Sequence, residues 1–347
     1  MSMPELPFLK FEAVHSVYTG SKALSPFHEC YANKDTILRL AAGRFFAHYN
    51  GEDIEEAYWA LRNRAALFDV PERPVEVSGP DVIGFLDQIF TRQSDHLKVG
   101  SGHYTLACNY NGGLFMDGIL FRLGEKKFWF VHPDGDLDTW FLAHSHNYDV
   151  SISDPQSRVL QVQGPKSLAI INTATNGSVD QTMGYFKAGI FTIGEQSVLI
   201  SRTGWTGELG YEIYTLGHNT DYKRLWDELI HSGKKYGMVF SSMQAMNIRR
   251  IEAGILDSGS DFDASMAPGE AGLHRFVDKN KKYFIGHEAI NKRNKDNRIH
   301  GVLTGSYIPK SGDLVHDGKN ALGYVTTGAY SPAFEAGIGY VRLNMAE

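Results

Sequence analysis

Residues 201–212 read SRTGWTGELGYE, a run with three glycines and a carboxylate at its end. Glycine allows the chain to reverse direction, so the run predicts a turn between strands at 189–202 and 211–216. Trp205 and Glu212 lie seven residues apart across this turn. We therefore expect both side chains to face one cavity.

Hydrophobic periodicity predicts further elements on either side of this turn. Helices are expected at residues 52–66, 81–90, 166–173, 222–236 and 245–256, and strands at 75–78, 103–109, 114–123, 127–132 and 159–163. Asn111-Gly112 marks the hairpin between two of the strands. A strand followed by Gly-Pro and a helix occurs at residues 79–80 and again at 164–165, which suggests an internal duplication of an α+β module.

The composition predicts a soluble globular protein of about two domains. The chain has 347 residues, a net charge of −6 and no long basic run, so a nucleic-acid groove is not expected. No apolar stretch approaches the ~18–20 residues that a membrane span requires. Cys30 and Cys108 form no CxxC pair and are too few for a disulfide framework, which favours the cytoplasm. The glycine-rich nucleotide and dinucleotide motifs are lacking.

Three ordered segments resemble the glycine-cleavage T-protein superfamily. Residues 201–212 match its pattern S-R-T-G-Y-T-G-E-x-G-[FY]-E, and residues 104–117, YTLACNYNGGLFMD, match its tyrosine, Gly-Gly hairpin and aspartate. The third segment is RIEA at 250–253, followed by GSDFD at 259–263 and PGEAGL at 268–273. The resemblance implies an enzyme that transfers one-carbon units with tetrahydrofolate.

The resemblance also implies a fold. The family packs three subdomains as a ring around a central folate, and its C-terminal barrel continues past the point where this chain ends. We expect an α+β fold with a folate-binding T-protein-type module at residues 1–290. Short strands near Val302, Ala321 and Gly339 predict a small β-barrel-like domain at 291–347, shortened relative to the family.

Some details resemble dimethylsulfoniopropionate demethylases more than true T-proteins. True T-proteins carry D-V-S-H-M-G where residues 69–74 read DVPERP, and they usually have two adjacent aspartates where Met116 precedes Asp117. The demethylase-like chains share the tryptophan at Trp205, and residues 133–136, PDGD, resemble their A-D-S-D. The resemblance therefore implies a small onium methyl donor, with transfer of its methyl group to N5 of tetrahydrofolate.

The candidate site residues all lie in or beside the matched motifs. A pterin edge suits carboxylates and aromatic faces, and an onium cation suits aromatic faces. The candidates are Asp117 for catalysis; Tyr104, Trp205, Glu212 and Arg250 for cofactor binding; and Trp205 and Tyr214 for the donor. No metal is expected, because His144 and His146 do not share a helix face.

Other functions remain open. An aminomethyltransferase would work with a lipoyl carrier protein, whereas the main hypothesis needs only a small-molecule donor. An aromatic O-demethylase would need a general acid such as His132. A non-catalytic folate-binding protein, like the iron–sulfur assembly members of the superfamily, would carry a cysteine that is missing from KYFIGHE at 282–288.

Overall fold

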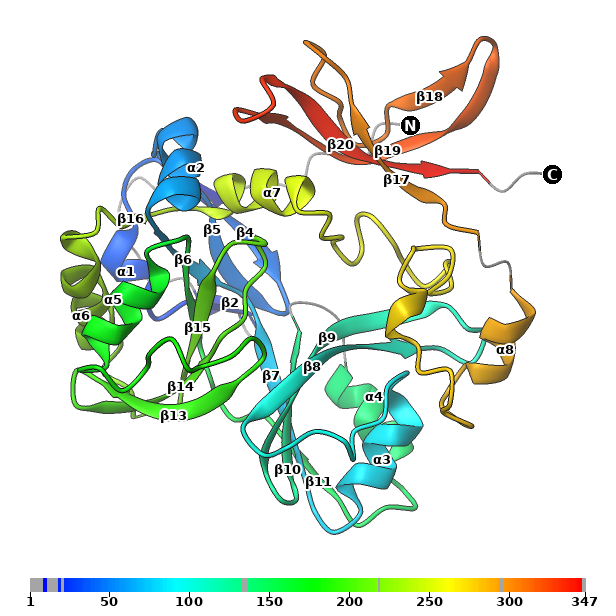
Figure 1. Ribbon diagram of the computed structural model, residues 1–347, viewed down its shortest axis with the longest axis horizontal. Helices are drawn as coiled ribbons and strands as arrows, with labels where there is room; N and C mark the ends of the chain where they lie inside the picture. Colours follow the sequence, from blue (N-terminus) through cyan, green and yellow to red (C-terminus); the bar gives the residue numbers. More distant parts are fainter. Residues whose placement is uncertain are drawn as a thin grey trace.

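A computed structural model describes residues 9–10, 18–19, 22–132, 137–217, 219–293 and 296–344. The segment 133–136, compared above with the demethylases, lies outside them. Four sheets and their helices surround a central region, which α7 (Met243–Glu252) spans from the third sheet to the C-terminal sheet (Figure 1).

The first two sheets each contain five strands. The first sheet has the order β1 (Leu9–Lys10), β4 (Thr36–Ala41), β5 (Arg44–Asn50), β3 (Lys22–Leu24) and β2 (Tyr18–Thr19). The second sheet has the order β11 (Ser151–Ser153), β7 (Arg73–Ser78), β10 (Lys127–His132), β9 (Leu114–Gly124) and β8 (Ser101–Cys108).

The third sheet has six strands and the C-terminal sheet has four. The third has the order β13 (Ala188–Ile193), β14 (Gln196–Ser201), β15 (Gly210–Thr215), β12 (Val159–Gln163), β6 (Ala66–Val70) and β16 (Val239–Phe240). The C-terminal sheet has the order β17 (Ile299–Leu303), β20 (Ala336–Leu343), β19 (Asn320–Ser331) and β18 (Leu314–Asp317).

The other helices pack against the sheets or, in the case of the helix after β5, against α7 (Figure 1). They are α1 (His28–Tyr31), α2 (Ile54–Asn63), α3 (Val82–Ile89), α4 (Leu137–His144), α5 (Ser167–Ala174), α6 (Tyr222–Lys234), α8 (His287–Lys292) and the 3-10 helix η1 (His274–Phe276). Leu225 and Leu229 of α6 pack with α5 against the third sheet, and Phe85 of α3 packs with α4 against the second. These are the two outer cores.

The predicted α+β fold with a small C-terminal β unit is confirmed. Two details differ from the expectation. The described C-terminal strands form an open four-stranded sheet, not a closed barrel. Residues 189–202 form the hairpin β13–β14, because Gly194 adopts a φ of 56° and Glu195 one of 65°, and this turn interrupts a run that alternates like one strand. The domain division after residue 290 stays a prediction.

The two Gly-Pro units have the same local form. In each, a strand ends at a glycine with positive φ, 138° at Gly79 and 121° at Gly164, and a helix follows within three residues. An added Cβ would lie 2.3 Å from the Asp149 carbonyl oxygen at the first glycine and 2.7 Å from that of Leu61 at the second. Both positions therefore require glycine; the duplication itself stays a prediction.

The β8–β9 hairpin provides a test of packing. Gly113 approaches the loop that follows α7 so closely that a Cβ would lie 1.8 Å from the Ala264 carbonyl oxygen. We expect Gly113→Ala to lower the free energy of unfolding by about 1–3 kcal/mol, because the loop must move away. Gly301→Ala is the matched control, since nothing lies within 4 Å of its added Cβ. Equal denaturation midpoints for the two variants would show that the loop does not press on the hairpin.

Candidate functional site

The inner faces of the second and third sheets meet in one hydrophobic cluster, called here the central cluster. Its buried members include Phe121 and Trp129 of the second sheet and Tyr214 of the third, and Met246 of α7 joins them. Trp205 is partly buried against the same cluster. Two of the predicted ligand-binding aromatic residues, Trp205 and Tyr214, thus lie together.

Asp117 lies on the inner face of β9, because side chains alternate along a strand and Phe121 of the same face joins the central cluster. The Tyr104 hydroxyl donates a hydrogen bond to Asp117 Oδ2 over 2.8 Å. Burial and the Asp117 carboxylate raise the pKa of Tyr104, so the phenol stays a donor. The Phe276 ring packs edge-on against Tyr104, with 4.6 Å between centroids, and holds its orientation.

Met116 points to the opposite side of β9. Its side chain is 3% exposed and belongs to the outer core formed with α3 and α4. A carboxylate at position 116 would therefore face that core, whereas Asp117 faces inward. The single aspartate in this chain does not reduce the number of carboxylates on the inner face.

Glu212 lies in the middle of the third sheet, only 4% exposed. Its Oε2 accepts hydrogen bonds from the hydroxyl groups of Thr203, at 2.5 Å, and Tyr214, at 2.6 Å. Its Oε1 accepts one from Gln161 Nε2 at 2.7 Å, directly across the β12–β15 pair. Burial raises the pKa of Glu212, and the hydroxyl donors oppose that shift.

These bonds leave Glu212 with limited capacity for a ligand. Glu212 Oε2 also accepts a longer hydrogen bond from the Ser201 hydroxyl at 3.5 Å, so its three donors are all hydroxyl groups, whereas Oε1 accepts only from Gln161 among these contacts. Beside it, Gln161 Nε2 also donates to Glu72 Oε1 at 3.0 Å, whereas Gln161 Oε1 is buried with no hydrogen-bond partner among the described residues. Two adjacent acceptor places, one on each residue, therefore remain for N–H groups.

Arg250 is 1% exposed on α7, with its guanidinium 5.3 Å from the centre of the Trp205 ring. Its N–H groups bond to Asn247 Oδ1, the Ile255 carbonyl, Asp261 Oδ2 and Thr327 Oγ1. Four of its five N–H groups are thus used within the protein. Its predicted role in cofactor binding stays a prediction, and the contacts suit it to support Trp205.

Sequence reasoning missed some polar groups around the central cluster. Gln161 had a signal, because a glutamine between Leu160 and Val162 in a buried strand needs polar partners. Glu72 had none, since it follows a proline in a connection. Tyr185 is 64% exposed, and partial burial together with the Glu212 carboxylate raises the pKa of its phenol.

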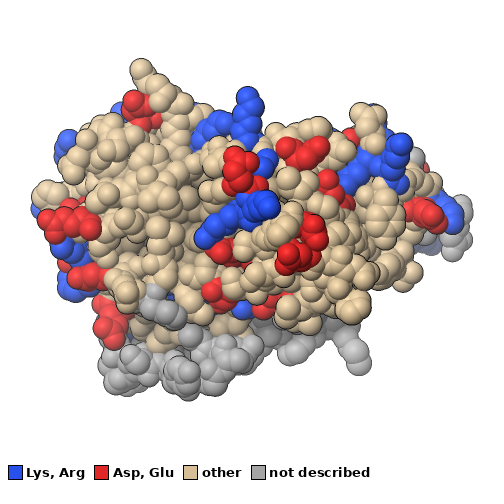
Figure 2. Space-filling model, turned by 90° about the horizontal axis from the view of Figure 1, so that it is seen from below, with Lys and Arg blue, Asp and Glu red and all other residues tan. Residues whose placement is uncertain are grey.

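The surface carries mixed charge. On the face shown in Figure 2, acidic and basic side chains are interspersed. Within the parts of the chain that the structure describes, no helix is both long and apolar enough to cross a bilayer. The same residues contain no group of three or more His, Cys, Asp or Glu side chains placed to hold a metal ion.

Comparison with known proteins identifies the family. Residues 32–281 match the GCVT N-terminal domain. This chain belongs to the GCVT family. It is 32% identical to an aminomethyltransferase of Thermoanaerobacter pseudethanolicus, over 89% of this chain and 90% of that protein. It is also 32% identical to an aminomethyltransferase of Alkaliphilus oremlandii, over 91% and 87%.

A solved GCVT-family structure shares the fold. The glycine cleavage system aminomethyltransferase T from Bartonella henselae superimposes with a TM-score of 0.82 at 23% identity, covering 92% of this chain and 89% of that one. The predictions of the superfamily, of a one-carbon transferase enzyme and of tetrahydrofolate as its cofactor are confirmed at the level of the family. The finer likeness to dimethylsulfoniopropionate demethylases stays a prediction.

The raised pKa of Glu212 predicts pH-dependent binding. A ligand N–H group bonds more strongly to the ionised carboxylate, so tetrahydrofolate affinity should increase as the pH rises through that raised pKa. Glu212→Gln should remove this dependence and weaken binding by about 1–3 kcal/mol. Titration calorimetry across the pH range measures both effects.

Glu208→Gln makes the same change in the same turn, where Glu208 pairs with Arg249 instead of the central cluster. It should keep the pH dependence. If Glu212→Gln retained it as well, Glu212 would not be the group that contacts the ligand.

Proposed function

We propose that this chain transfers a one-carbon unit from an aminomethyl donor to tetrahydrofolate. The observation that carries the proposal is the position of Asp117, oriented by Tyr104 on the inner face of β9 while Met116 faces the outer core. The single aspartate is thus no argument against an aminomethyltransferase. Similarity to aminomethyltransferases over about nine-tenths of both chains supports the same function.

The third sheet fits the pterin edge. That edge presents neighbouring N–H donors, and Glu212 Oε1 and Gln161 Oε1 offer two neighbouring acceptor places. A buried acceptor without a partner costs about 1–3 kcal/mol, and a ligand donor recovers it. Aromatic side chains of the central cluster, among them Trp205, supply flat surfaces for the ring.

Tetrahydrofolate supplies nitrogen nucleophiles for the one-carbon unit. In the balanced reaction, the methylene carbon loses its bonds to sulfur and to the amine nitrogen and forms one bond to each of two folate nitrogens, which release one proton each. The thiol takes one of the two displaced protons, and the amine leaves as ammonium. The Asp117 carboxylate holds the protonated amine of the donor, and the Tyr104 hydroxyl fixes the orientation of that carboxylate. A lipoyl carrier protein is the donor partner that this function requires.

An onium methyl donor is the second candidate, supported by the aromatic surroundings of Tyr214. The Phe121 and Trp129 rings lie 6.4 Å and 6.3 Å from the Tyr214 ring, both edge-on. Aromatic faces attract a cation by about 0.5–2 kcal/mol each, and displacement of an onium methyl needs little proton transfer. Trp205 and Tyr214 would then contact the donor.

The two candidates are separated by their donors. Wild-type protein is incubated with tetrahydrofolate and either a loaded aminomethyl-lipoyl carrier or, without carrier, a sulfonium or betaine. We expect methylenetetrahydrofolate and ammonia from the carrier, and no 5-methyltetrahydrofolate from the onium compounds. The reverse result would establish the onium donor, and activity with neither would overturn both candidates.

Asp117→Asn tests the carboxylate in the same assay. The variant keeps the shape of the side chain and removes its charge, so turnover should fall by about 10–1000-fold. Asp180→Asn, on an exposed loop, is the control and should retain wild-type turnover. Unchanged turnover in Asp117→Asn would remove Asp117 from the reaction.

Trp205→Leu should instead weaken tetrahydrofolate binding, because an aliphatic side chain replaces the flat ring.

A further inference from the structure

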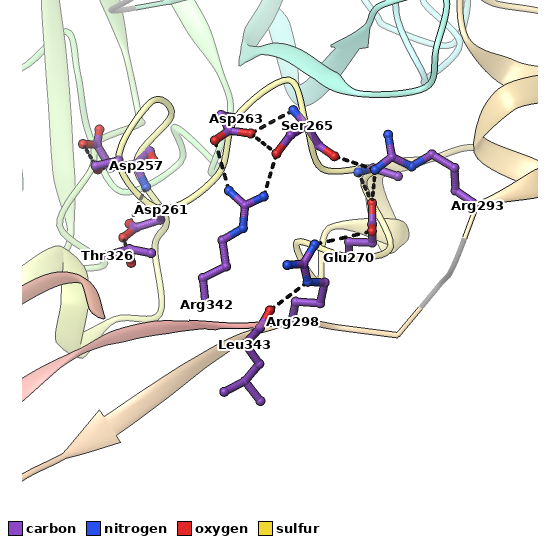
Figure 3. A network of polar contacts seen from close by, with 12 residues as sticks. Asp257, Asp261, Asp263, Ser265, Glu270, Arg293, Arg298, Thr326, Arg342 and Leu343 are labelled. Atoms are coloured by element: carbon purple, nitrogen blue, oxygen red, sulfur yellow. Dashed lines mark hydrogen bonds and ion pairs between the residues drawn. The ribbon is translucent and has the colours of Figure 1, made fainter. Parts of the chain in front are cut away.

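One loop contacts the C-terminal sheet, the start of β9 and Arg250 of α7. We call residues 257–270 the clasp loop; it follows α7 and precedes η1. Its carboxylates Asp261, Asp263 and Glu270 form the centre of the polar network in Figure 3. The partners come largely from arginine and threonine side chains, so the network is charged and specific in geometry.

The C-terminal sheet binds the clasp loop at three points. Arg342 of β20 donates from Nη1 to Asp263 Oδ2 at 3.0 Å and from Nη2 to Ser265 Oγ at 2.6 Å. The Thr326 hydroxyl of β19 donates to Asp261 Oδ1 at 2.7 Å. The Arg298 amide, just before β17, donates to the Glu270 carbonyl at 2.7 Å. The sheet and the loop are thereby fixed to each other.

The same loop holds the start of β9. The Leu114 amide donates to the Met266 carbonyl at 2.7 Å, and Gly113 lies against Ala264. Met266 is also fully buried in one hydrophobic cluster with Leu114 and with Tyr340 of β20. Asp117 follows Leu114 by three residues on the same strand. The position of the loop therefore fixes the start of β9, and with it the place of Asp117 on the inner face of that strand.

A second connection runs through α7. The Arg250 guanidinium lies near two rings, 5.3 Å from the centre of Trp205 and 5.6 Å from the centre of Tyr340 of the C-terminal sheet. It pairs with Asp261 of the clasp loop, and its Nη2 donates to Thr327 Oγ1 of β19 at 3.0 Å. Trp205 thus lies beside a cation that Thr327 and Tyr340 of the C-terminal sheet help to hold.

We propose that the C-terminal sheet positions the two halves of the site through separate residues. Arg342 acts through the clasp loop on Asp117, and Thr327 acts through Arg250 on Trp205. The inference rests on the proposed roles of Asp117 in transfer and of Trp205 in folate binding. It makes Arg342 and Thr327 positioning residues, and it predicts different kinetic effects when each is altered.

The test compares four variants of the full chain. Thr327→Val removes the acceptor for Arg250 and should raise the tetrahydrofolate Kd and KM by about 2- to 30-fold with little change in kcat. Arg342→Gln should lower kcat by a similar factor and leave the Kd close to that of wild type. Thr304→Val is the matched control: Thr304 bonds only within the C-terminal unit, to Tyr307 and Gly337, and should change neither constant. Thr327→Ser restores the acceptor and should restore the Kd.

Fluorescence gives a readout that requires no substrate. The difference between wild type and Trp205→Phe isolates the emission of Trp205 from that of the other tryptophans. This difference spectrum should change when Thr327→Val is introduced and stay constant with Thr304→Val. An unchanged spectrum in Thr327→Val overturns the Thr327 connection whatever the protein binds. An Arg342→Gln kcat equal to that of Thr304→Val, in a folded protein, overturns the Arg342 connection.

A failure of the proposed function has a different signature. In that case the wild-type protein would neither bind tetrahydrofolate nor transfer a one-carbon unit, while the Trp205 spectra would still report on the Thr327 connection. For the Arg342 connection, the amide exchange rates at the start of β9 serve the same purpose. Arg342→Gln should accelerate hydrogen exchange at the Leu114 amide, which donates a hydrogen bond to the Met266 carbonyl oxygen. Unchanged exchange there counts against the connection directly.

Discussion

The buried ion pair between Arg250 and Asp261 is the interaction on which the arrangement of the units depends. Both side chains are nearly inaccessible, 1% and 0% exposed, so each charge has lost its water and needs the other. Removal of one partner from such a pair typically costs about 3–5 kcal/mol, because the remaining charge is buried unpaired. Here the loss would extend to Trp205 and Thr327, which contact the same guanidinium. Helix α7, the clasp loop and the C-terminal sheet therefore meet at a single charge.

A second buried carboxylate, Glu212, lies in the third sheet next to Tyr214 of the central cluster. Glu212 is held by Thr203, Tyr214 and Gln161, and these bonds offset the cost of its burial. The same contacts occupy most of its acceptor capacity, so a ligand must share the remaining places between Glu212 and Gln161. Under the proposed function, specificity for a pterin edge comes from the acceptor places that the protein leaves unsatisfied, more than from the presence of one carboxylate.

Side-chain direction changes the functional argument. From the sequence alone, the lack of a second aspartate before Asp117 favoured a demethylase. The pleat of β9 turns Met116 into the outer core and Asp117 inward, so the missing carboxylate never belonged to the inner face. Local composition in a strand thus says little about chemistry until it is known which face each residue occupies.

The sequence by itself determined the family, the α+β class, most of the elements and the motifs that carry Asp117, Trp205 and Glu212. These follow from local rules: periodicity, glycine turns and matched segments act over a few residues. It missed the β13–β14 turn, because alternation continues through residues 194–195. Only the tertiary structure decided that Arg250 is buried and that Gln161 stands beside Glu212, since these depend on contacts between residues far apart in the chain, whose relative position no local pattern encodes.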